Sequence, residues 1–566
     1  MPAYPKWVSR HFHLRRYMMN GIRKKLAFTA LGIGAFLLLT GGEGMAAEVT
    51  TTAPSASTFV NTLAKTALES KQAKTYHLNF KANKYTEKEM TYEGQKVKFR
   101  AYENIVYVAH PADKSSETMS IYIPEAYFTK GGTVNGYTAR TAPIFMPNGV
   151  GGYMPGEIKA PSESDKMSGS ANASLGALAH GYVVAAPAIR GRTTKNSAGV
   201  YVGKAPAFIV DYKAAVRYLR HNKDRLPAGD TEKIISNGTS AGGALSALLG
   251  ATGNAVEYEP YLRAIGAANE RDDIFASMDY CPITNLDHAD MAYEWVFNGQ
   301  NDYHQRPMMA PPAGAKPGAA PMGAPAAGAK TDRPANAPTD TVEATPMTAE
   351  EIAVSAELKK AFPSYLNSLG LKDKDGTPLR LNADGTGTFA DYIKSVYMAS
   401  AQSALDKGED LSSLDWLTIE NGKVTAMDLS KYAAWATRMK AAPAFDKMDG
   451  SSPENDEFGD SANNPKHFTK FSKDHGRKNI PLADSDIITL MNPLNFIGKK
   501  DVTTAHYWRI RHGAKDRDTS LAIPAILALD LANHGADVDF ASPWGKGHAG
   551  DYDLDELFAW IDRICK

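Results

Sequence analysis

The feature of this sequence that most limits its fold is a serine held between glycines, in Gly238-Thr239-Ser240-Ala241-Gly242. A β-branched segment, KIIS, precedes it, and a small-residue segment that favours a helix, ALSALLG, follows it. A serine at such a strand-to-helix turn is typical of a nucleophile elbow, in which a tight, strained turn lifts the hydroxyl above the edge of a sheet. The N–H groups at the start of the helix can donate to a developing oxyanion. We therefore predict that Ser240 is a nucleophile and that the N–H of Ala241 forms part of an oxyanion hole.

Strand-like and helix-like segments alternate on both sides of this motif. Upstream, the strand-like segments are APIFMPNGVGG and GYVVAAPAIRGR, and the amphipathic helix-like segment is DYKAAVRYLRHNKDRLP. Downstream, the alternation resumes with HYWRIRHGAKD and closes with VDFASPWGKGHAG and LDELFAWIDRIC. This alternation predicts an α/β fold with a mostly parallel sheet and helices on both faces.

The alternation is interrupted over roughly 200 residues, which we interpret as an insertion. Residues 306–346 are rich in Ala, Pro and Gly, a composition that cannot bury a core and that predicts a disordered loop. Further on, two Asp-Gly pairs predict a β-hairpin in LKDKDGTPLRLNADGTGTF. The predicted domain boundaries are an α/β domain formed by 47–288 and 489–566, and an inserted domain at 289–488.

The N-terminus carries the features of a secretory leader. Arg23, Lys24 and Lys25 precede an apolar run of about 14 residues, and small residues follow up to Ala46 and Ala47. The run is shorter than the roughly 20 residues of a membrane-spanning helix. We therefore predict a signal peptide at residues 1–46 and an exported protein, periplasmic or secreted, without stable membrane association; the alternative is an uncleaved anchor.

Charge and cysteine content exclude several classes of protein. The whole chain has 63 basic and 63 acidic residues, and removing the leader leaves 56 and 62. A nucleic-acid-binding protein normally shows a basic excess, so no nucleic-acid partner is predicted. The only cysteines, Cys281 and Cys565, exclude a disulfide scaffold and a Cys-based zinc module, although one disulfide is compatible with an exported protein.

A serine nucleophile needs a base, and the base needs an acid that orients it. His548 lies in GHAG, between the last predicted strand and the terminal helix, where a catalytic histidine belongs in such a fold. The preceding strand ends in Asp516 and Asp518, so the chain order Ser…Asp…His is that of α/β-hydrolases. Spacing alone does not separate the two aspartates.

A second donor to the oxyanion is expected from the loop after an earlier strand. The segment NGVGG at 148–152 follows the strand APIFMP, as the glycine loop of esterases does. We take the N–H of Gly151 as the candidate, with the other N–H groups of the loop as alternatives. The competing interpretation is an ordinary flexible turn.

Several longer segments resemble the bacterial tannases, which are tannin acyl hydrolases of the α/β-hydrolase superfamily with a large lid domain. These segments are NGTSAGGALSALLGATG, YCPITNLDHADMAYEW, SSPENDEFGD, RIRHGAKDRDTSLAIPAILAL and GHAGDYDLDELFAWID. The resemblance covers roughly residues 80–566 apart from the Ala/Pro-rich stretch. It implies Ser240 as the nucleophile, Asp516 as the triad acid and His548 as the base. No metal or other cofactor is required on this interpretation.

The resemblance further implies a galloyl-binding trio, with Lys440 and Glu454 from the lid and Asp518 beside the triad acid. Two carboxylates can accept hydrogen bonds from the phenolic hydroxyls of gallate, and an ammonium can donate to a phenolic oxygen. The pattern of the fungal tannases and their feruloyl-esterase relatives is different: one cysteine directly precedes the serine and another directly precedes the histidine. Thr239 and Gly547 stand there, which excludes that subgroup.

The sequence thus predicts a secreted serine esterase that hydrolyses galloyl esters of tannins through an acyl-enzyme and releases gallate. Small galloyl esters and tannins are the predicted partners. Two alternatives stay open: a carboxylesterase of the feruloyl type that acts on other phenolic esters, and a secreted binding protein that kept the fold without catalysis.

Overall fold

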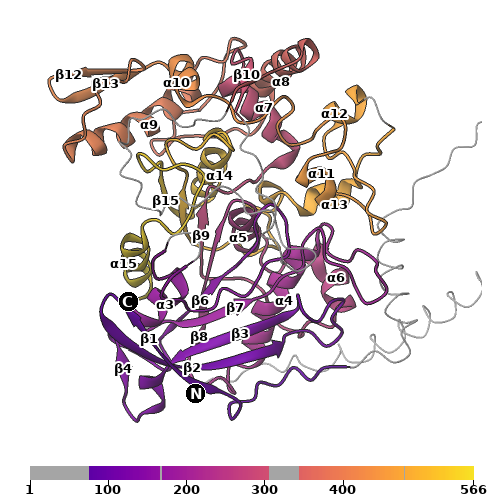
Figure 1. Cartoon of the computed structure of the whole chain (residues 1–566), viewed down its shortest axis with the longest axis vertical. Coiled ribbons are helices and arrows are strands. Elements are labelled where there is room, and N and C mark those ends of the chain that lie inside the picture. The colour runs from indigo at the N-terminus through magenta and orange to yellow at the C-terminus, as the bar shows by residue number, and fades with distance from the viewer. Residues whose placement is uncertain (1–74, 166–168, 305–342, 477–478) are drawn as a thin grey trace, which may run out of the picture. The chain divides into compact units, whose positions relative to one another are not determined.

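In the computed structural model, which describes residues 75–165, 169–304, 343–476 and 479–566, nine strands form one sheet (Figure 1). In order across the sheet they are β1 (Thr86–Tyr92), β2 (Gln95–Val106), β3 (Thr118–Pro124), β7 (Val183–Pro187), β6 (Pro143–Pro147), β8 (Asp230–Thr239), β9 (Ala276–Tyr280), β14 (Tyr507–Arg511) and β15 (Asp537–Ala541). Neighbouring strands from β7 to β15 are parallel, whereas β1, β2 and β3 pair antiparallel. The predicted mostly parallel sheet is confirmed.

Burial along the strands follows from their place in the sheet. The central strands β6, β7 and β9, with the sequences PIFMP, VVAAP and ASMDY, are buried at every residue. Parallel strands covered on both faces need continuous apolar or small residues rather than an alternating pattern. The edge strand β1, TEKEMTY, instead alternates and leaves most of its residues in contact with solvent.

Two groups of helices cover the sheet. The helices α3 (Ala173–Ala179) and α15 (Leu554–Cys565) contact one another, and Phe558 of α15 meets Phe145 of β6 with ring centroids 6.3 Å apart. The helices α4 (Ala207–His221) and α5 (Ala241–Ala251) form the second group, and α5 packs on β8 and β9. The helix α14 (Ala522–Asn533) packs on β14 and β15, and α6 (Glu259–Ala264) packs against α4.

The segment between β9 and β14 is mainly helical. Its helices are α7 (Leu286–Phe297), α8 (Ala349–Ser368), α9 (Thr388–Asp406), α10 (Leu429–Ala436), α11 (Pro453–Glu457), α12 (Lys470–His475) and α13 (Ser485–Leu490). Its strands are β10 (Asp302–Tyr303), β11 (Thr345–Pro346), β12 (Leu417–Glu420) and β13 (Lys423–Met427). The predicted boundaries at 288/289 and 488/489 fall inside α7 and α13. The division into two domains stays a prediction.

The short elements complete the described chain. They are η1 (Glu125–Phe128), β4 (Thr133–Val134), β5 (Tyr137–Thr138), η2 (Val256–Tyr258) and η3 (Pro493–Asn495). The predicted signal peptide and most of the predicted disordered loop lie outside the described residues. The end of that loop does not, because Thr345–Pro346 pairs with Asp302–Tyr303 as a two-residue ladder.

The hairpin predicted in LKDKDGTPLRLNADGTGTF is wrong. Between α8 and α9 the structure has two local turns, and within this described stretch only one bridge, Lys372 with Pro378, is formed. The carboxylate of Asp373 accepts the N–H groups of Asp375 and Thr377, so it closes its own turn without a strand ladder. The true hairpin is β12–β13, with Asn421 and Gly422 at its tip, both at positive φ.

The described residues bear on membrane spanning and on the pairing of the two cysteines. No helix in the described ranges is both long and apolar enough to cross a lipid bilayer. Cys281 and Cys565 are both buried and both free thiols, so the disulfide that the sequence left open is not formed.

Candidate active site

Ser240 occupies a strained turn between β8 and α5. Its backbone has φ 61° and ψ −122°, a region that non-glycine residues rarely adopt. Glycines on either side make this turn possible. A Cβ on Gly238 would lie 2.1 Å from the carbonyl oxygen of Gly242, and one on Gly242 would lie 2.6 Å from that of Val150. The turn therefore has the tight geometry of a nucleophile elbow.

The register of the parallel strands brings the ends of three strands together. Thr239 at the end of β8 pairs with Tyr280 at the end of β9, and Tyr280 pairs with Arg511 at the end of β14. Because parallel strands end at the same edge of a sheet, the residues that follow these three positions lie side by side. Ser240 and Cys281 therefore lie at neighbouring positions. The loop that carries Asp516 starts beside them.

A chain of hydrogen bonds links Ser240, His548 and Asp516. The Nε2 atom of His548 lies 2.8 Å from Ser240 Oγ, and its Nδ1 atom lies 2.9 Å from Asp516 Oδ2. Neutral His548 with its proton on Nδ1 would donate to the carboxylate and accept from the serine hydroxyl. The three predicted residues are thus brought together in the order that proton transfer from Ser240 requires.

Asp516 is buried and well supplied with donors. Its Oδ1 atom accepts the N–H groups of Asp518 at 2.9 Å and Thr519 at 3.4 Å. Burial alone would raise the pKa of this carboxyl, but His548, His512 and these N–H donors outweigh it and lower the pKa to about 2. Asp516 is therefore a carboxylate throughout the neutral range.

Burial and neighbouring charges shift the pKa of His548 in opposite directions. Burial favours the neutral ring, whereas the carboxylates of Asp516 and Asp518 favour the imidazolium and raise the pKa of His548 well above its usual 6.5. The Oδ1 atom of Asp518 lies 3.8 Å from His548 Nε2. The site therefore stabilises a positive charge on the ring, the charge that a general base acquires when it takes a proton.

The loop at 148–152 stands directly against the elbow. The Nδ2 atom of Asn148 donates to the carbonyl oxygens of Asn237 at 3.1 Å and Gly242 at 2.9 Å. Gly151 follows in this loop, and a Cβ at this position would meet no other atom within 4 Å. Ala241 is the first residue of α5, so its N–H has no carbonyl one helical turn earlier to bond. Asn148, which the sequence analysis did not single out, fastens the loop to the elbow.

Asp518 connects the Ser240–His548–Asp516 chain with the segment between β9 and β14. The Nζ atom of Lys440 donates to Asp518 Oδ1 at 3.0 Å, and it lies 4.1 Å from the centroid of the Phe445 ring. Burial raises the pKa of Asp518, but Lys440 and His548 outweigh it and lower that pKa below its usual value. The carboxylates of Asp518 and Glu454 overcome burial and raise the pKa of Lys440. The two side chains are about one-fifth exposed, so a ligand can reach this ion pair.

Glu454 lies in α11 and interacts with Lys440 through charge. In the described part of the chain no hydrogen bond joins the two side chains directly. Burial raises the pKa of Glu454, and Lys440 only partly offsets this. Ser452 caps α11 by accepting the N–H of Asn455 at 2.9 Å, as the SSPEN segment allows. The structure thus places Glu454 in a capped helix, close enough to Lys440 and Asp518 to interact with both through charge.

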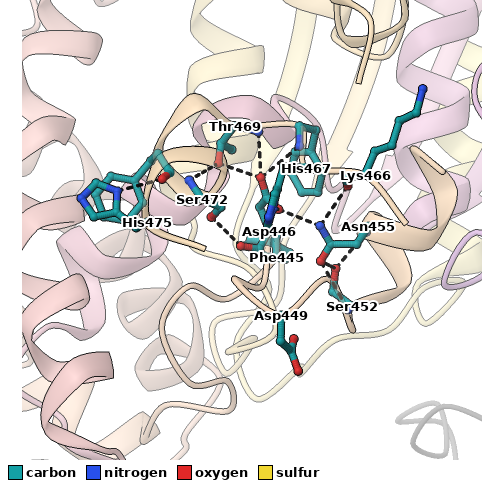
Figure 2. Close-up of polar contacts among 12 residues, drawn as sticks. Phe445, Asp446, Asp449, Ser452, Asn455, Lys466, His467, Thr469, Ser472 and His475 are labelled. Atoms are coloured by element: carbon teal, nitrogen blue, oxygen red, sulfur yellow. Dashed lines mark hydrogen bonds and ion pairs between the residues drawn. The ribbon is translucent and has the colours of Figure 1, made fainter. Parts of the chain in front are cut away.

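A buried aspartate in the insertion organises this region, and the sequence analysis missed it (Figure 2). One oxygen of Asp446 accepts a hydrogen bond from Asn455 Nδ2 at 2.7 Å. The same oxygen lies 2.7 Å from His467 Nδ1. The other oxygen accepts the N–H groups of Phe468 at 3.0 Å and Thr469 at 2.8 Å, and the hydroxyl of Thr469 at 2.7 Å. Asp446 therefore fixes α11, which carries Glu454, to the segment before α12.

The same network is tied to α7. One oxygen of Asp290 accepts the N–H of Phe445 at 2.7 Å, and the other accepts that of Asp446 at 3.1 Å. Burial and the charge of Asp446 raise the pKa of Asp290 to about 7. Because the Phe445 ring lies beneath Lys440, Asp290 and Asp446 set the positions of both Lys440 and Glu454.

Tyr293 of α7 links the two halves of the site. Its hydroxyl donates to the carbonyl oxygen of Arg517 at 2.9 Å and accepts the N–H groups of Met439 at 3.0 Å and Lys440 at 3.3 Å. Arg517 lies between the two aspartates, so Tyr293 joins the triad loop to the backbone of Lys440. Its place in the segment DHADMAYEW was the only sequence signal for this role.

The chain was compared with known proteins. The BD-FAE family model matches residues 151–331, and no curated protein matches. Among solved structures, the tannase of Fusobacterium nucleatum is 49% identical, with a TM-score of 0.79 over 87% of this chain and 100% of that chain. The tannin acyl hydrolase from Lactobacillus plantarum is 44% identical, with a TM-score of 0.77 over 86% and 99%. A tannin acyl hydrolase in complex with ethyl gallate is 44% identical, with a TM-score of 0.76 over 86% and 99%.

These relatives match nearly their whole length and confirm both the predicted fold class and the resemblance read from the sequence. The chain therefore belongs to the tannase family of α/β-hydrolases and is a carboxylic ester hydrolase.

Proposed function

We propose that this protein hydrolyses galloyl esters through a covalent acyl-enzyme on Ser240. The observation that carries the proposal is the hydrogen-bonded chain from Ser240 through His548 to Asp516, with the Asp518–Lys440 pair beside it. One similar solved structure is a complex with ethyl gallate and another a complex with 3,4-dihydroxybenzoate. Both of those ligands carry adjacent phenolic hydroxyls.

In the proposed reaction, Ser240 attacks the ester carbonyl while His548 takes the hydroxyl proton on Nε2. The carboxylate of Asp516 holds the ring in the required tautomer and stabilises the imidazolium. The N–H groups of Ala241 and Gly151 are the proposed donors to the tetrahedral oxyanion. His548 then protonates the leaving alcohol, and a water molecule activated by the same ring releases the acid from Ser240.

Recognition of the galloyl ring is assigned to Lys440, Glu454 and Asp518. The ammonium of Lys440 can donate to a phenolic oxygen, and the carboxylates of Asp518 and Glu454 can accept from phenolic hydroxyls. A ring without these hydroxyls would displace water from the ammonium and the carboxylates without offering them hydrogen bonds. This loss costs binding free energy. The site should therefore prefer gallate esters over benzoate esters.

The proposal extends to the place of action and to the insertion. We assign residues 1–46 as a signal peptide that exports the enzyme, and the segment at 289–488 as a lid that contributes Lys440 and Glu454. Intact mass and N-terminal sequencing of protein recovered outside the cytoplasm test the first assignment. A mature chain that retained residues 1–46 would contradict it.

The test of substrate class is hydrolysis of four methyl esters: gallate, protocatechuate, ferulate and benzoate. We expect kcat/KM to be highest for gallate, lower for protocatechuate, which lacks one hydroxyl, and lowest for ferulate and benzoate. A preference for ferulate would instead support the alternative of a feruloyl-type carboxylesterase. The family assignment argues against the other alternative, a binding protein without catalysis.

A further inference from the structure

A free thiol lies beside the triad and has no part in the proposed acyl transfer. Cys281 directly follows β9, is fully buried and has a backbone φ of 36°. Its Sγ atom donates to the carbonyl oxygen of Ala549 at 3.5 Å, next to His548. The strand register explains this position, because β9 lies between β8, which leads to Ser240, and β14, which leads to Asp516.

Cys281 forms a cluster with two members of the triad. The Sγ atom of Cys281, a carboxylate oxygen of Asp516 and a ring nitrogen of His548 all lie within 4.8 Å of one another. Among the described residues, this is the only group of three or more His, Cys, Asp and Glu side chains with the spacing of a metal site. Cys281 and Asp516 are buried, and His548 is about one-quarter exposed, which leaves an approach for an ion.

We propose that Cys281, Asp516 and His548 form an inhibitory site for a thiophilic divalent cation such as Zn²⁺ or Cd²⁺. The proposal rests on the proposed function, since inhibition requires that His548 be the catalytic base. A set of one sulfur, one nitrogen and one oxygen suits Zn²⁺, which accepts three protein ligands and leaves a fourth position open. Mg²⁺ and Ca²⁺ prefer oxygen ligands and are not expected to bind.

The distances suit such an ion. Bonds to Zn²⁺ are about 2.0–2.3 Å long, which sets tetrahedral ligand atoms roughly 3.3–3.8 Å apart. The three ligand atoms lie within 4.8 Å of one another, so side-chain rotations that shorten the longest separation by about 1 Å would give this geometry. The thiolate of Cys281 and the carboxylate of Asp516 would balance the charge of the ion inside a buried site.

A metal ion bound to either ring nitrogen of His548 would prevent the ring from acting as the base. An ion on Nδ1 displaces the proton that faces Asp516, so the neutral ring keeps its proton on Nε2 and donates to Ser240 instead of accepting. An ion on Nε2 occupies the lone pair itself. In both cases the thiol proton of Cys281 passes to solvent, no atom changes oxidation state, and Ser240 loses its proton acceptor.

The chain offers a matched control. Cys565, the other cysteine, is also a buried free thiol, but it lies at the end of α15, where Lys233 donates to its carbonyl oxygen at 2.7 Å. Wild type, Cys281→Ala and Cys565→Ala can be titrated with Cd²⁺ while methyl gallate hydrolysis is measured. Each variant is normalised to its own rate without metal.

We expect wild type and Cys565→Ala to lose activity at the same Cd²⁺ concentration, with one ion bound per chain by calorimetry and recovery on chelation. Cys281→Ala should need at least about tenfold more Cd²⁺. Mg²⁺ at the same concentrations should have no effect. Equal inhibition of Cys281→Ala and wild type would overturn the proposal, and so would Cd²⁺ binding that leaves the hydrolysis rate unchanged.

A readout that does not depend on activity separates this proposal from the proposed function. Co²⁺ bound to Cys281 should give a thiolate charge-transfer band in wild type and in Cys565→Ala, and none in Cys281→Ser, which keeps a hydroxyl donor towards Ala549. Asp516→Asn should weaken Co²⁺ binding and retain the band. If Ser240→Ala kept esterase activity, the triad assignment would fail while this band still reported on the cluster. Absence of the band in wild type would contradict the metal site alone.

Discussion

The proposed triad region and the proposed ring-binding region of this site are built in different ways. Ser240 and the loop that carries Asp516 follow β8 and β14, two parallel strands of one sheet that flank β9, and His548 follows β15 at the edge of the sheet. Lys440 and Glu454 come from the segment between β9 and β14, where Asp446 and Asp290 hold their surroundings by hydrogen bonds. The first region depends on strand register, and the second depends on a buried polar network.

The two regions should therefore respond differently to substitution. Strand ends are held by the whole core, so a substitution in the triad should remove chemistry while the fold stays intact. A buried network fails when one acceptor is lost, because its donors are then left without partners. Substitutions in the network should therefore change both stability and substrate preference.

The largest expected effect is that of Ser240→Ala. Removing the nucleophile should lower kcat for every ester by at least about 10⁴-fold, with the melting temperature nearly unchanged. Ester hydrolysis and thermal unfolding of the same sample measure both quantities. Ser395→Ala, on the exposed part of α9, is a matched control and should behave as wild type. Residual activity of Ser240→Ala near the wild-type rate would remove the triad from this site.

Asp516→Asn should come next. An amide in place of the carboxylate favours the wrong tautomer of His548 and leaves the imidazolium unsupported, so kcat should fall by roughly 10³–10⁴-fold. Because this defect concerns the base, methyl gallate and methyl benzoate should slow by similar factors. Steady-state kinetics on both esters measure the ratio. A loss confined to gallate would mean that Asp516 binds the ring instead.

Local patterns were enough to single out the three residues that the structure brings together as a hydrogen-bonded chain. The glycines around Ser240 and the alternation of strands and helices are properties of neighbouring residues, and chain order then pointed to Asp516 and His548. The two aspartates were separated only by resemblance, because residues 516 and 518 follow the same strand. The structure distinguishes their contacts: Asp516 meets His548 Nδ1, and Asp518 meets Lys440.

The polar network between β9 and β14 could not be predicted from the sequence, for a physical reason. Asp446 joins partners that are 9 to 23 residues away along the chain, and Asp290 is 156 residues away, so no periodic pattern marks them. The Asp-Gly turns after α8 misled the hairpin prediction, since turn residues such as Asp373 can satisfy their own backbone. Cys281 was noticed only as a cysteine, because its place beside the triad follows from strand register.

Asp518→Asn should have a smaller and selective effect. The variant keeps the hydrogen-bonded triad but weakens the acceptor for ring hydroxyls and the contact with Lys440. We expect kcat/KM for methyl gallate to fall by about 10–100-fold and that for methyl benzoate to change much less. The measurement is the ratio of the two values. An equal loss on both esters, combined with a gallate-selective loss in Asp516→Asn, would require the two assignments to be exchanged.

Asp446→Asn tests the network of Figure 2. Both oxygens of Asp446 accept from several donors, whereas an amide offers one oxygen and turns an NH₂ group towards the others. We expect the free energy of unfolding to fall by about 2–4 kcal/mol. Because Glu454 and Phe445 lose their support, KM for methyl gallate should rise several-fold while turnover of methyl benzoate is kept.

Denaturant unfolding and the two-ester comparison measure these effects. Asp449→Asn is the matched control, because Asp449 is an exposed aspartate in the same segment and an amide oxygen can keep the 3.1 Å contact with the N–H of Ser451. It should leave stability and KM close to wild type. If Asp446→Asn lost stability without any change in gallate selectivity, the network would support the fold and not the ring-binding site.

The smallest expected effect is a shift in pH dependence, and its sign links the two regions. Only neutral His548 can act as the base, so kcat/KM should rise as the pH rises through the pKa of His548. The carboxylate of Asp518, 3.8 Å from Nε2, helps to raise the pKa of His548. Asp518→Asn removes this charge, so the pKa should fall and the acid limb of the profile should move to lower pH.

Lys440→Met provides the opposite test. Lys440 offsets the charge of Asp518, so its removal should raise the pKa of His548 and move the acid limb to higher pH. A simple aryl acetate is the appropriate substrate, because it has no ring hydroxyls whose binding could mask the shift. Profiles of kcat/KM for wild type and both variants should diverge in opposite directions. Shifts in the same direction would mean that Asp518 and Lys440 reach His548 by rearranging the loop rather than through their charges.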